Sequence, residues 1–273
     1  MAEWITAPDD PRIADYRDVR ERDLVGRRGR FIAEGSVVLR CLLESPFARP
    51  ESILVAEARA PGLEDLLARA PADAPVYFAS QPVMDAIVGF PIHRGVLAIG
   101  RRPSPCSLAS VLGDGDSERL VLALSGIANH DNMGGLFRNA AAFGVDAVML
   151  GSDCCDPFYR KALRVSVGGV LKIPHVRLAP SEDPVQALAD QGFRVLALSP
   201  SGQRELAEIR GGGRLAVLLG AEGPGLPPDV LARCETVRIP MAVGFDSLNV
   251  ATTSGIVLHH LRSRSSGPEG TPE

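Results

Sequence analysis

Short apolar and amphipathic blocks follow one another along the first hundred residues. The predicted strands are 31–34, 52–55, 76–79 and 95–99, and the predicted helices are 36–43, 63–69 and 81–88. This alternation predicts a small α/β domain. The stretch before it, 1–24, carries dense mixed charge, and we expect a solvated helix there, with Pro11 in its first turn.

The same alternation resumes after residue 119. The predicted strands are 120–124, 146–150, 173–176, 194–198, 215–219 and 236–239, and the predicted helices are 132–143, 156–169, 184–190, 228–233 and 247–261. Short strands alternating with helices imply a largely parallel sheet. We therefore expect an α/β domain at 1–103, a Pro- and Ser-rich linker at 104–118 with one helical turn at 108–112, a second α/β domain at 119–263, and a disordered tail at 264–273.

One helix in the second domain carries unusual polar residues. Apolar residues at helical spacing follow a polar turn that ends at Asn132, whose side chain we expect to cap the first turn. Arg138 lies inside this apolar pattern, where a guanidinium is rarely found without a partner. Either the helix packs in the core and Arg138 reaches the surface, or Arg138 has a chemical role.

Two later stretches add turns that suit a ligand. Residues 218–227 read LLGAEGPGLP and residues 239–250 read IPMAVGFDSLNV. The glycines of the first stretch permit tight turns and a close approach of a ligand to the backbone. The stretch is not a phosphate-binding P-loop, because no Lys-Ser/Thr pair follows it, and the chain has no G-x-G-x-x-G after a strand.

Composition limits the classes of function. The chain has 273 residues, of which 45% are hydrophobic and 5% aromatic, so its core is aliphatic. A formal net charge of −4 argues against a protein held to nucleic acid by bulk charge, so any RNA-binding site must be a local patch. Among 29 basic residues only Lys161 and Lys172 are lysines. That bias reflects either genomic composition or contacts of arginine with phosphates and bases.

The sequence predicts neither a membrane span nor a metal site. Charged residues follow Met1, so no signal peptide is expected, and no apolar stretch reaches ~18 residues. The five cysteines show no C-x-x-C spacing. We expect free thiols in a reducing cytoplasm and no metal ligands.

The three stretches together resemble the motifs of the SpoU-type (TrmH-like) branch of the SPOUT RNA methyltransferases. The matching residues are Asn132, Gly134 and Arg138; then Gly220, Glu222, Gly223 and Gly225; then Ile239, Pro240, Met241, Ser247, Leu248, Asn249 and Val250. The resemblance implies a domain with a deep trefoil knot, although knots are otherwise almost absent from proteins. It also implies a homodimer formed through the knot and the last helix.

The same resemblance implies the cofactor and the reaction. S-adenosylmethionine would be held by the backbone at Gly220, Ile239 and Leu248, with Met241 nearby; plain core packing is the alternative for Ile239 and Leu248. The methyl group would pass to a ribose 2′-OH. The catalytic candidates are Arg138, to stabilise the developing alkoxide; Asn132, to orient Arg138 or the ribose; Ser247 and Asn249, to position the substrate; and Glu222, to pair with Arg138, from the same or the partner protomer.

The expected substrate is RNA, either tRNA or rRNA. The first domain resembles the RNA-binding domains that precede many SpoU-type catalytic domains, and Arg27, Arg28 and Arg30 form its best candidate basic patch. His93 and Arg94 are further candidates for RNA contact. Two alternatives remain: a SPOUT enzyme that methylates a base, and a non-catalytic RNA-binding or assembly factor. Asp246 and the polar run 251–255 depart from the family pattern and leave the identity of the substrate open.

Overall fold

The computed structural model describes residues 2–17, 25, 29–88, 95–113, 115, 117–245 and 247–265. The chain divides into two compact units. Met1–Ser104 and Asp156–Lys172 form the first, and Pro105–Cys155 and Ile173–Glu273 form the second. Arg27, Arg28, His93, Arg94 and Asp246 lie outside the described residues. Within those residues, no helix is long and apolar enough to cross a membrane.

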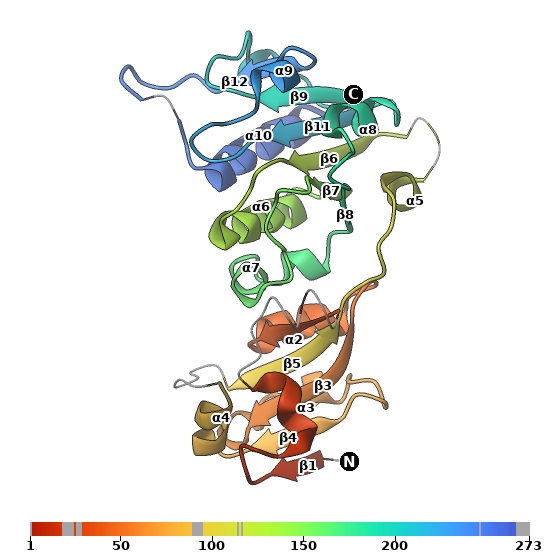
Figure 1. The fold of residues 1–273 in the computed structure, drawn as a ribbon, viewed down its shortest axis with the longest axis vertical. Coiled ribbons are helices and arrows are strands. Elements are labelled where there is room, and N and C mark those ends of the chain that lie inside the picture. Colours follow the sequence, from red (N-terminus) through yellow and green to blue (C-terminus); the bar gives the residue numbers. More distant parts are fainter. Residues whose placement is uncertain are drawn as a thin grey trace, which may run out of the picture. The chain divides into compact units, whose positions relative to one another are not determined.

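The first unit is built on a five-stranded sheet of order β1-β4-β3-β5-β2 (Figure 1). Its strands are β1 (Ala2–Ile5), β2 (Arg30–Glu34), β3 (Arg49–Ala56), β4 (Val76–Ala79) and β5 (Val96–Arg101), and its helices are α2 (Ser36–Leu43), α3 (Glu64–Leu67), α4 (Gln81–Val88) and α7 (Arg160–Val165), with 3₁₀ turns η1 (Pro11–Tyr16), η2 (Glu57–Arg59) and η3 (Gly169–Leu171). β5 runs antiparallel to β2 and β3, and the other pairs are parallel.

The long solvated helix predicted for the first 24 residues is not formed where the structure describes them, although Pro11 does lie in the first turn of a short helix, as predicted. Ala2–Ile5 instead pairs with β4 as an edge strand, and Pro11–Tyr16 is a 3₁₀ helix. Ile5, Ile13 and Tyr16 are buried in the core on one face of the sheet. The prediction gave most weight to the many charged residues of this stretch. The few apolar residues decide the local structure, because they are the ones that become buried.

The segment Asp156–Lys172 was predicted to belong to the second domain, since it follows β7 in the chain. It packs with the first unit instead. The Phe158 ring lies against the Phe31 ring, with centroids 4.9 Å apart, and the Arg102 guanidinium carbon is 4.9 Å from the centroid of the same ring. Arg160 Nε donates to the buried Glu34 carboxylate at 2.8 Å. The predicted helix 156–169 is also shorter than expected, because helix α7 gives way to the turn η3.

The second unit contains a seven-stranded sheet of order β10-β12-β9-β11-β6-β7-β8 in which every pair is parallel. Its strands are β6 (Arg119–Leu124), β7 (Ala147–Leu150), β8 (His175–Arg177), β9 (Arg194–Leu198), β10 (Arg204–Glu205), β11 (Arg214–Leu219) and β12 (Glu235–Arg238), and its helices are α5 (Leu108–Leu112), α6 (His130–Ala142), α8 (Pro184–Ala189), α9 (Pro228–Leu231) and α10 (Val250–Ser265), with the 3₁₀ turn η4 (Leu206–Glu208). The prediction of an α/β fold with a largely parallel sheet is confirmed.

Helices cover both faces of this sheet, as a parallel sheet requires. α6 and α10 pack together on one face, and α5 and α8 lie on the other (Figure 1). Leu108 and Leu112 of α5 are buried in the core, so the middle of the predicted linker belongs to the second unit. α10 continues to Ser265, past the predicted start of the tail.

The aromatic contact of the segment Asp156–Lys172 predicts a large stability effect. Phe158 is buried, so Phe158→Ala should lower the free energy of unfolding of the first unit by about 3–5 kcal/mol. Urea denaturation followed by circular dichroism measures this change. Phe245→Ala is the matched control, because that ring is 73% exposed, and it should change stability by less than about 0.5 kcal/mol. Equal effects of the two substitutions would contradict the packing described.

Candidate active site

A cavity of about 380 Å³ lies at the carboxyl ends of β9, β11 and β12. Ligands of open parallel sheets bind outside this edge, and small-molecule sites span about 300–1,000 Å³. The residues that line the cavity are Leu198, Ser199, Pro200, Leu219, Gly220, Ala221, Glu222, Gly223, Gly225, Val237, Ile239, Met241, Ser247, Leu248, Asn249, Val250 and Thr253. All four predicted cofactor-binding residues and three predicted catalytic ones are among them.

One wall of the cavity is a tight turn after β11. Gly225 N donates to Ala221 O at 3.0 Å and closes the turn. A Cβ atom added to Gly220 would lie 2.5 Å from the carbonyl carbon of Gly225, so only glycine lets the two backbone segments meet. Gly223 and Gly225 have φ of +85° and +69°, which glycine adopts without strain. The sequence GAEGPG therefore shapes the cavity through its backbone.

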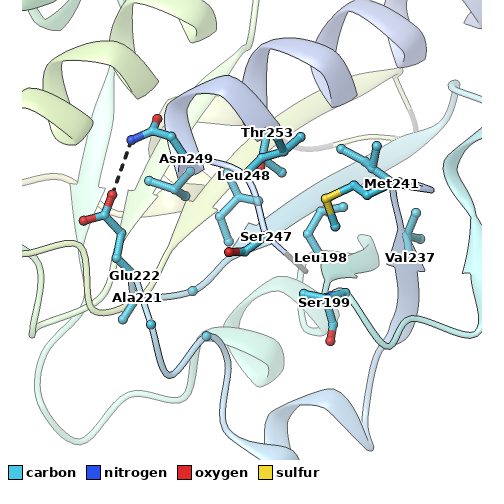
Figure 2. A pocket seen from close by; sticks show the side chains of 17 residues that line it. Leu198, Ser199, Ala221, Glu222, Val237, Met241, Ser247, Leu248, Asn249 and Thr253 are labelled. Carbon is cyan, nitrogen blue, oxygen red and sulfur yellow. Dashed lines mark hydrogen bonds between the residues drawn. The ribbon is translucent and has the colours of Figure 1, made fainter. Parts of the chain in front are cut away.

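The cavity is apolar on one side and polar on the other. Figure 2 shows Met241 and Val237 on one side, Leu248 and Ser247 near the middle, and Glu222 with Asn249 on the opposite side. Leu198 and Ser199, at the end of β9, also line it and were missed by the sequence analysis. The sequence could have indicated them, because β9 is parallel to its neighbour β11 and the two strands end at the same edge of the sheet.

Glu222, Asn132 and Asn249 form a hydrogen-bonded cluster, which we call the amide–carboxylate cluster. Asn132 Nδ2 donates to Glu222 Oε1. Asn249 Nδ2 donates to Asn132 Oδ1 at 2.8 Å and to Glu222 Oε1 at 3.4 Å (Figure 2 shows the second bond). Residues from all three motifs thus meet, and Glu222 accepts from two amides and not from Arg138.

The capping role predicted for Asn132 is wrong, and Asn249 has a capping role that the sequence did not predict. Asn132 is not the N-cap of α6, since Asn129 Oδ1 accepts from Asp131 N at 2.7 Å. Asn132 is buried in the cluster instead. Asn249 Oδ1 accepts from Ala251 N at 2.9 Å and Thr252 N at 3.2 Å, so Asn249 caps α10. The expected start of this helix at Ser247 is therefore three residues early.

Helix α6 also holds the first turn of α10 beyond the cluster. A Cβ atom on Gly135 would lie 2.7 Å from the Cβ of Ala251, so the helices are in close contact there. Asn139 Nδ2 donates to Ala251 O at 2.6 Å and to Ser254 Oγ at 2.8 Å. Ser254 is fully buried, which explains one polar residue in the run that departs from the family pattern.

Arg138 is exposed on α6 and is not among the residues that line the cavity. No hydrogen bond or ion pair joins its guanidinium to another residue in the described part of the chain. Glu222, Asn132, Asn249 and Ser247 are therefore gathered at or beside the cavity, and Arg138 is presented to solvent from the same helix as Asn132. Over the described ranges, no group of three or more His, Cys, Asp or Glu side chains is arranged to hold a metal ion.

A parallel sheet with a glycine-walled cavity at its carboxyl edge is typical of α/β proteins that bind small ligands at their strand ends. The chain belongs to the SpoU rRNA methylase family, whose model matches residues 119–259. This confirms the resemblance inferred from the three motifs.

Relatives of known sequence or structure cover most of the chain. An uncharacterized tRNA/rRNA methyltransferase of Mycobacterium tuberculosis is 42% identical over 267 residues, which cover 94% of this chain and 90% of the relative. An AdoMet-bound rRNA methyltransferase from Sinorhizobium meliloti has a TM-score of 0.82 at 24% identity and covers 96% of this chain and 98% of its own. An RNA 2′-O ribose methyltransferase has a TM-score of 0.77 at 24% identity, with 94% and 97% covered. These two structures share the fold.

The close contact at Gly135 generates a test of helix spacing. Gly135→Ala should push α10 away from α6 and lower the methyl-transfer rate roughly tenfold to hundredfold, because small misplacements of reacting groups are costly. Adding Ala251→Gly removes the opposing Cβ and should restore most of the rate. Single-turnover kinetics measure this, with Ala251→Gly alone as the control. A double variant as slow as Gly135→Ala would show that helix spacing is not the cause.

Proposed function

We propose that this chain transfers the methyl group of S-adenosylmethionine to a ribose 2′-OH of tRNA or rRNA. The observation that carries the proposal is the amide–carboxylate cluster, which joins the wall of the cavity to the helix that presents Arg138. Family membership supports an RNA methyltransferase, and the AdoMet-bound structural neighbour supports the cofactor.

The cavity suits the cofactor in size and in chemistry. Leu198, Ile239 and Leu248 offer an apolar slot for an adenine ring, and the backbone of the turn at Gly220 offers amides to orient it. When bound, the cofactor supplies an electrophilic methyl group on a positively charged sulfur. The polar side of the cavity, at Glu222 and Asn249, is where the nucleophile would approach.

The transfer needs a positioned hydroxyl and compensation for the charge that develops on it. The ribose oxygen would take the methyl group as the bond from that carbon to the cofactor's sulfur breaks, and the hydroxyl proton would leave to solvent. The positive charge of Arg138 stabilises the developing alkoxide and the adjacent phosphate. Asn132, Ser247 and Asn249 hold the ribose, and Glu222 fixes the two amides.

A ribose oxygen fits these residues better than a base atom. Base methylation through a covalent adduct needs a thiolate, and Cys154 is the cysteine that follows the end of β7 most closely. Burial raises the pKa of the Cys154 thiol, and its Sγ lies 3.3 Å from Leu124 O. Cys154 is therefore a core residue, whereas Arg138 and the amides suit a sugar flanked by phosphate.

A second copy of the chain would complete the site. A groove of about 560 Å³ lies along α10, lined by Phe143, Leu206, Gly255, Ile256, His259, His260 and Ser263. Ile256 is 40% exposed in this groove, and Arg138 lies on the neighbouring helix α6. We propose a homodimer that covers this groove and brings Arg138 to the partner's cavity. The trefoil knot, the cytoplasmic location and RNA binding by the first unit are parts of the same proposal.

Arg138 should act on the nucleophile and not on the cofactor. Arg138→Ala should cut the transfer rate by about 100-fold to 1,000-fold, because a group that stabilises developing charge contributes about 3 kcal/mol. Cofactor affinity, measured by calorimetry, should stay within about threefold of wild type. Arg138→Lys should recover little of the rate if bidentate contact matters. Loss of cofactor binding with an unchanged rate would reverse this assignment.

The dimer proposal predicts a change in mass. Ile256→Asp places a charge in the apolar groove and should convert the dimer to a ~29 kDa monomer in sedimentation experiments at micromolar concentration. Val243→Asp is the control, because that side chain is fully exposed outside the groove, and it should leave the dimer intact. A wild-type chain that sediments as a monomer would refute the proposal.

The product itself decides between ribose and base. A 2′-O-methyl group prevents attack of that oxygen on the neighbouring phosphate, so alkaline hydrolysis of methyl-labelled RNA should leave the label in an uncleaved dinucleotide. A DNA copy of the substrate should be inert, since it lacks the 2′-OH. Label recovered only in mononucleotides would indicate a methylated base.

A further inference from the structure

The first unit carries an exposed patch that the active site does not use. It lies where α2 meets the segment 164–172 and consists of Val37, Arg40, Arg164, Val167 and Lys172, which we call the α2 patch. All five residues belong to the first unit.

Contacts between α2 and the segment bring these residues together. Cys41 Sγ lies 3.6 Å from Val167 O, and Ser45 Oγ donates to Leu171 O at 2.8 Å. Arg40 precedes Cys41 and Lys172 follows Leu171, so each cation is next in sequence to one of these two contacts. Burial raises the pKa of the Cys41 thiol; the positive charges of Lys172 and Arg40 oppose that rise, and the negative charge of Glu44 adds to it.

Positive charge on this patch is not neutralised. No hydrogen bond or ion pair joins Arg40 or Lys172 to another residue in the described ranges. Arg164 Nη1 is 3.7 Å from Glu34 Oε2, but that buried carboxylate already accepts from Arg160 at 2.8 Å. The nearby Glu44 pairs with Arg69. By contrast Arg30, a predicted RNA contact, is held by Asp15 and Glu51.

The patch also exposes apolar surface beside its cations. Val37 is 52% exposed and Val167 is 39% exposed. Val167 has φ of +54°, a conformation that costs a β-branched residue energy and that the packing of Gly168 against Cys41 holds in place. Cations beside apolar side chains match RNA, whose phosphates alternate with riboses and unpaired bases.

We propose that the α2 patch binds the backbone of the RNA substrate, with Arg40, Arg164 and Lys172 on phosphates and Val37 and Val167 against riboses or bases. This inference rests on the proposed function and adds the surface that selects RNA. It fits a chain whose net charge is −4, because such a chain can bind RNA through a local patch of positive charge but not through bulk charge.

The test reverses two charges in the full-length chain. Arg40→Glu with Lys172→Glu should weaken binding of a methylatable RNA at least about tenfold in filter binding at 100 mM salt. The slope of log affinity against log salt should fall by roughly two, one for each lost phosphate contact. Affinity for S-adenosylmethionine should be unchanged, because both residues lie in the first unit and not at the cavity. Val37→Ser should weaken RNA binding without changing the salt slope.

Arg49→Glu with Arg210→Glu is the control of equal charge. Arg49 pairs with Asp73 and Arg210 lies in the second unit, so this variant should change RNA affinity by less than about threefold. If the wild-type chain methylates the RNA and the patch variant binds that RNA as tightly as the wild-type chain does, the RNA-binding role of the α2 patch is wrong. The proposed function would still stand. Normal binding of free RNA with activity lost only on ribonucleoprotein would assign the patch to a protein and overturn the RNA proposal. A wild-type chain that binds no RNA would overturn both.

Discussion

The second unit depends on one set of hydrogen bonds, those among Asn132, Glu222 and Asn249. The three residues come from α6, from the glycine turn after β11, and from the residue that caps α10. Asn132 is the buried member of the set, so removing its partner Glu222 would leave the Asn132 amide unsatisfied, which costs about 1–3 kcal/mol. The cluster therefore fixes the position of the cavity wall relative to the helix that presents Arg138.

Packing on either side of the cluster supports the same arrangement. Gly135 lets α6 and α10 approach closely, and Asn139 bonds the backbone of the turn that Asn249 caps. On the cavity side, Gly220 brings the turn against its own backbone. Because the residues that shape the cavity act mainly through backbone and amide groups, small changes there should alter rate and affinity more than overall stability.

Much of this could be predicted from sequence, because strand and helix periodicity is local. The elements β4, α2 and β9 fall where their apolar patterns predict them, and the second and third motifs indicated many of the residues that line the cavity. Longer-range packing could not be predicted. Nothing local in the segment Asp156–Lys172 says that Phe158 packs on Phe31, and nothing in the charged start of the chain shows that Ile5 and Ile13 complete a core. Likewise the cap of α6 at Asn129 follows from Asn132 being held by Glu222, ninety residues away.

The central claim is that the amide–carboxylate contact organises the site, and exchanging its two partners tests that claim most directly. Asn132→Asp sets two carboxylates against each other and should slow single-turnover methyl transfer by about 100-fold, a loss comparable to leaving a buried charge uncompensated. Asn132→Asp with Glu222→Gln restores one amide and one carboxylate in exchanged positions. We predict that this double variant transfers the methyl group at least about tenfold faster than Asn132→Asp alone. A double variant no faster than Asn132→Asp would contradict it.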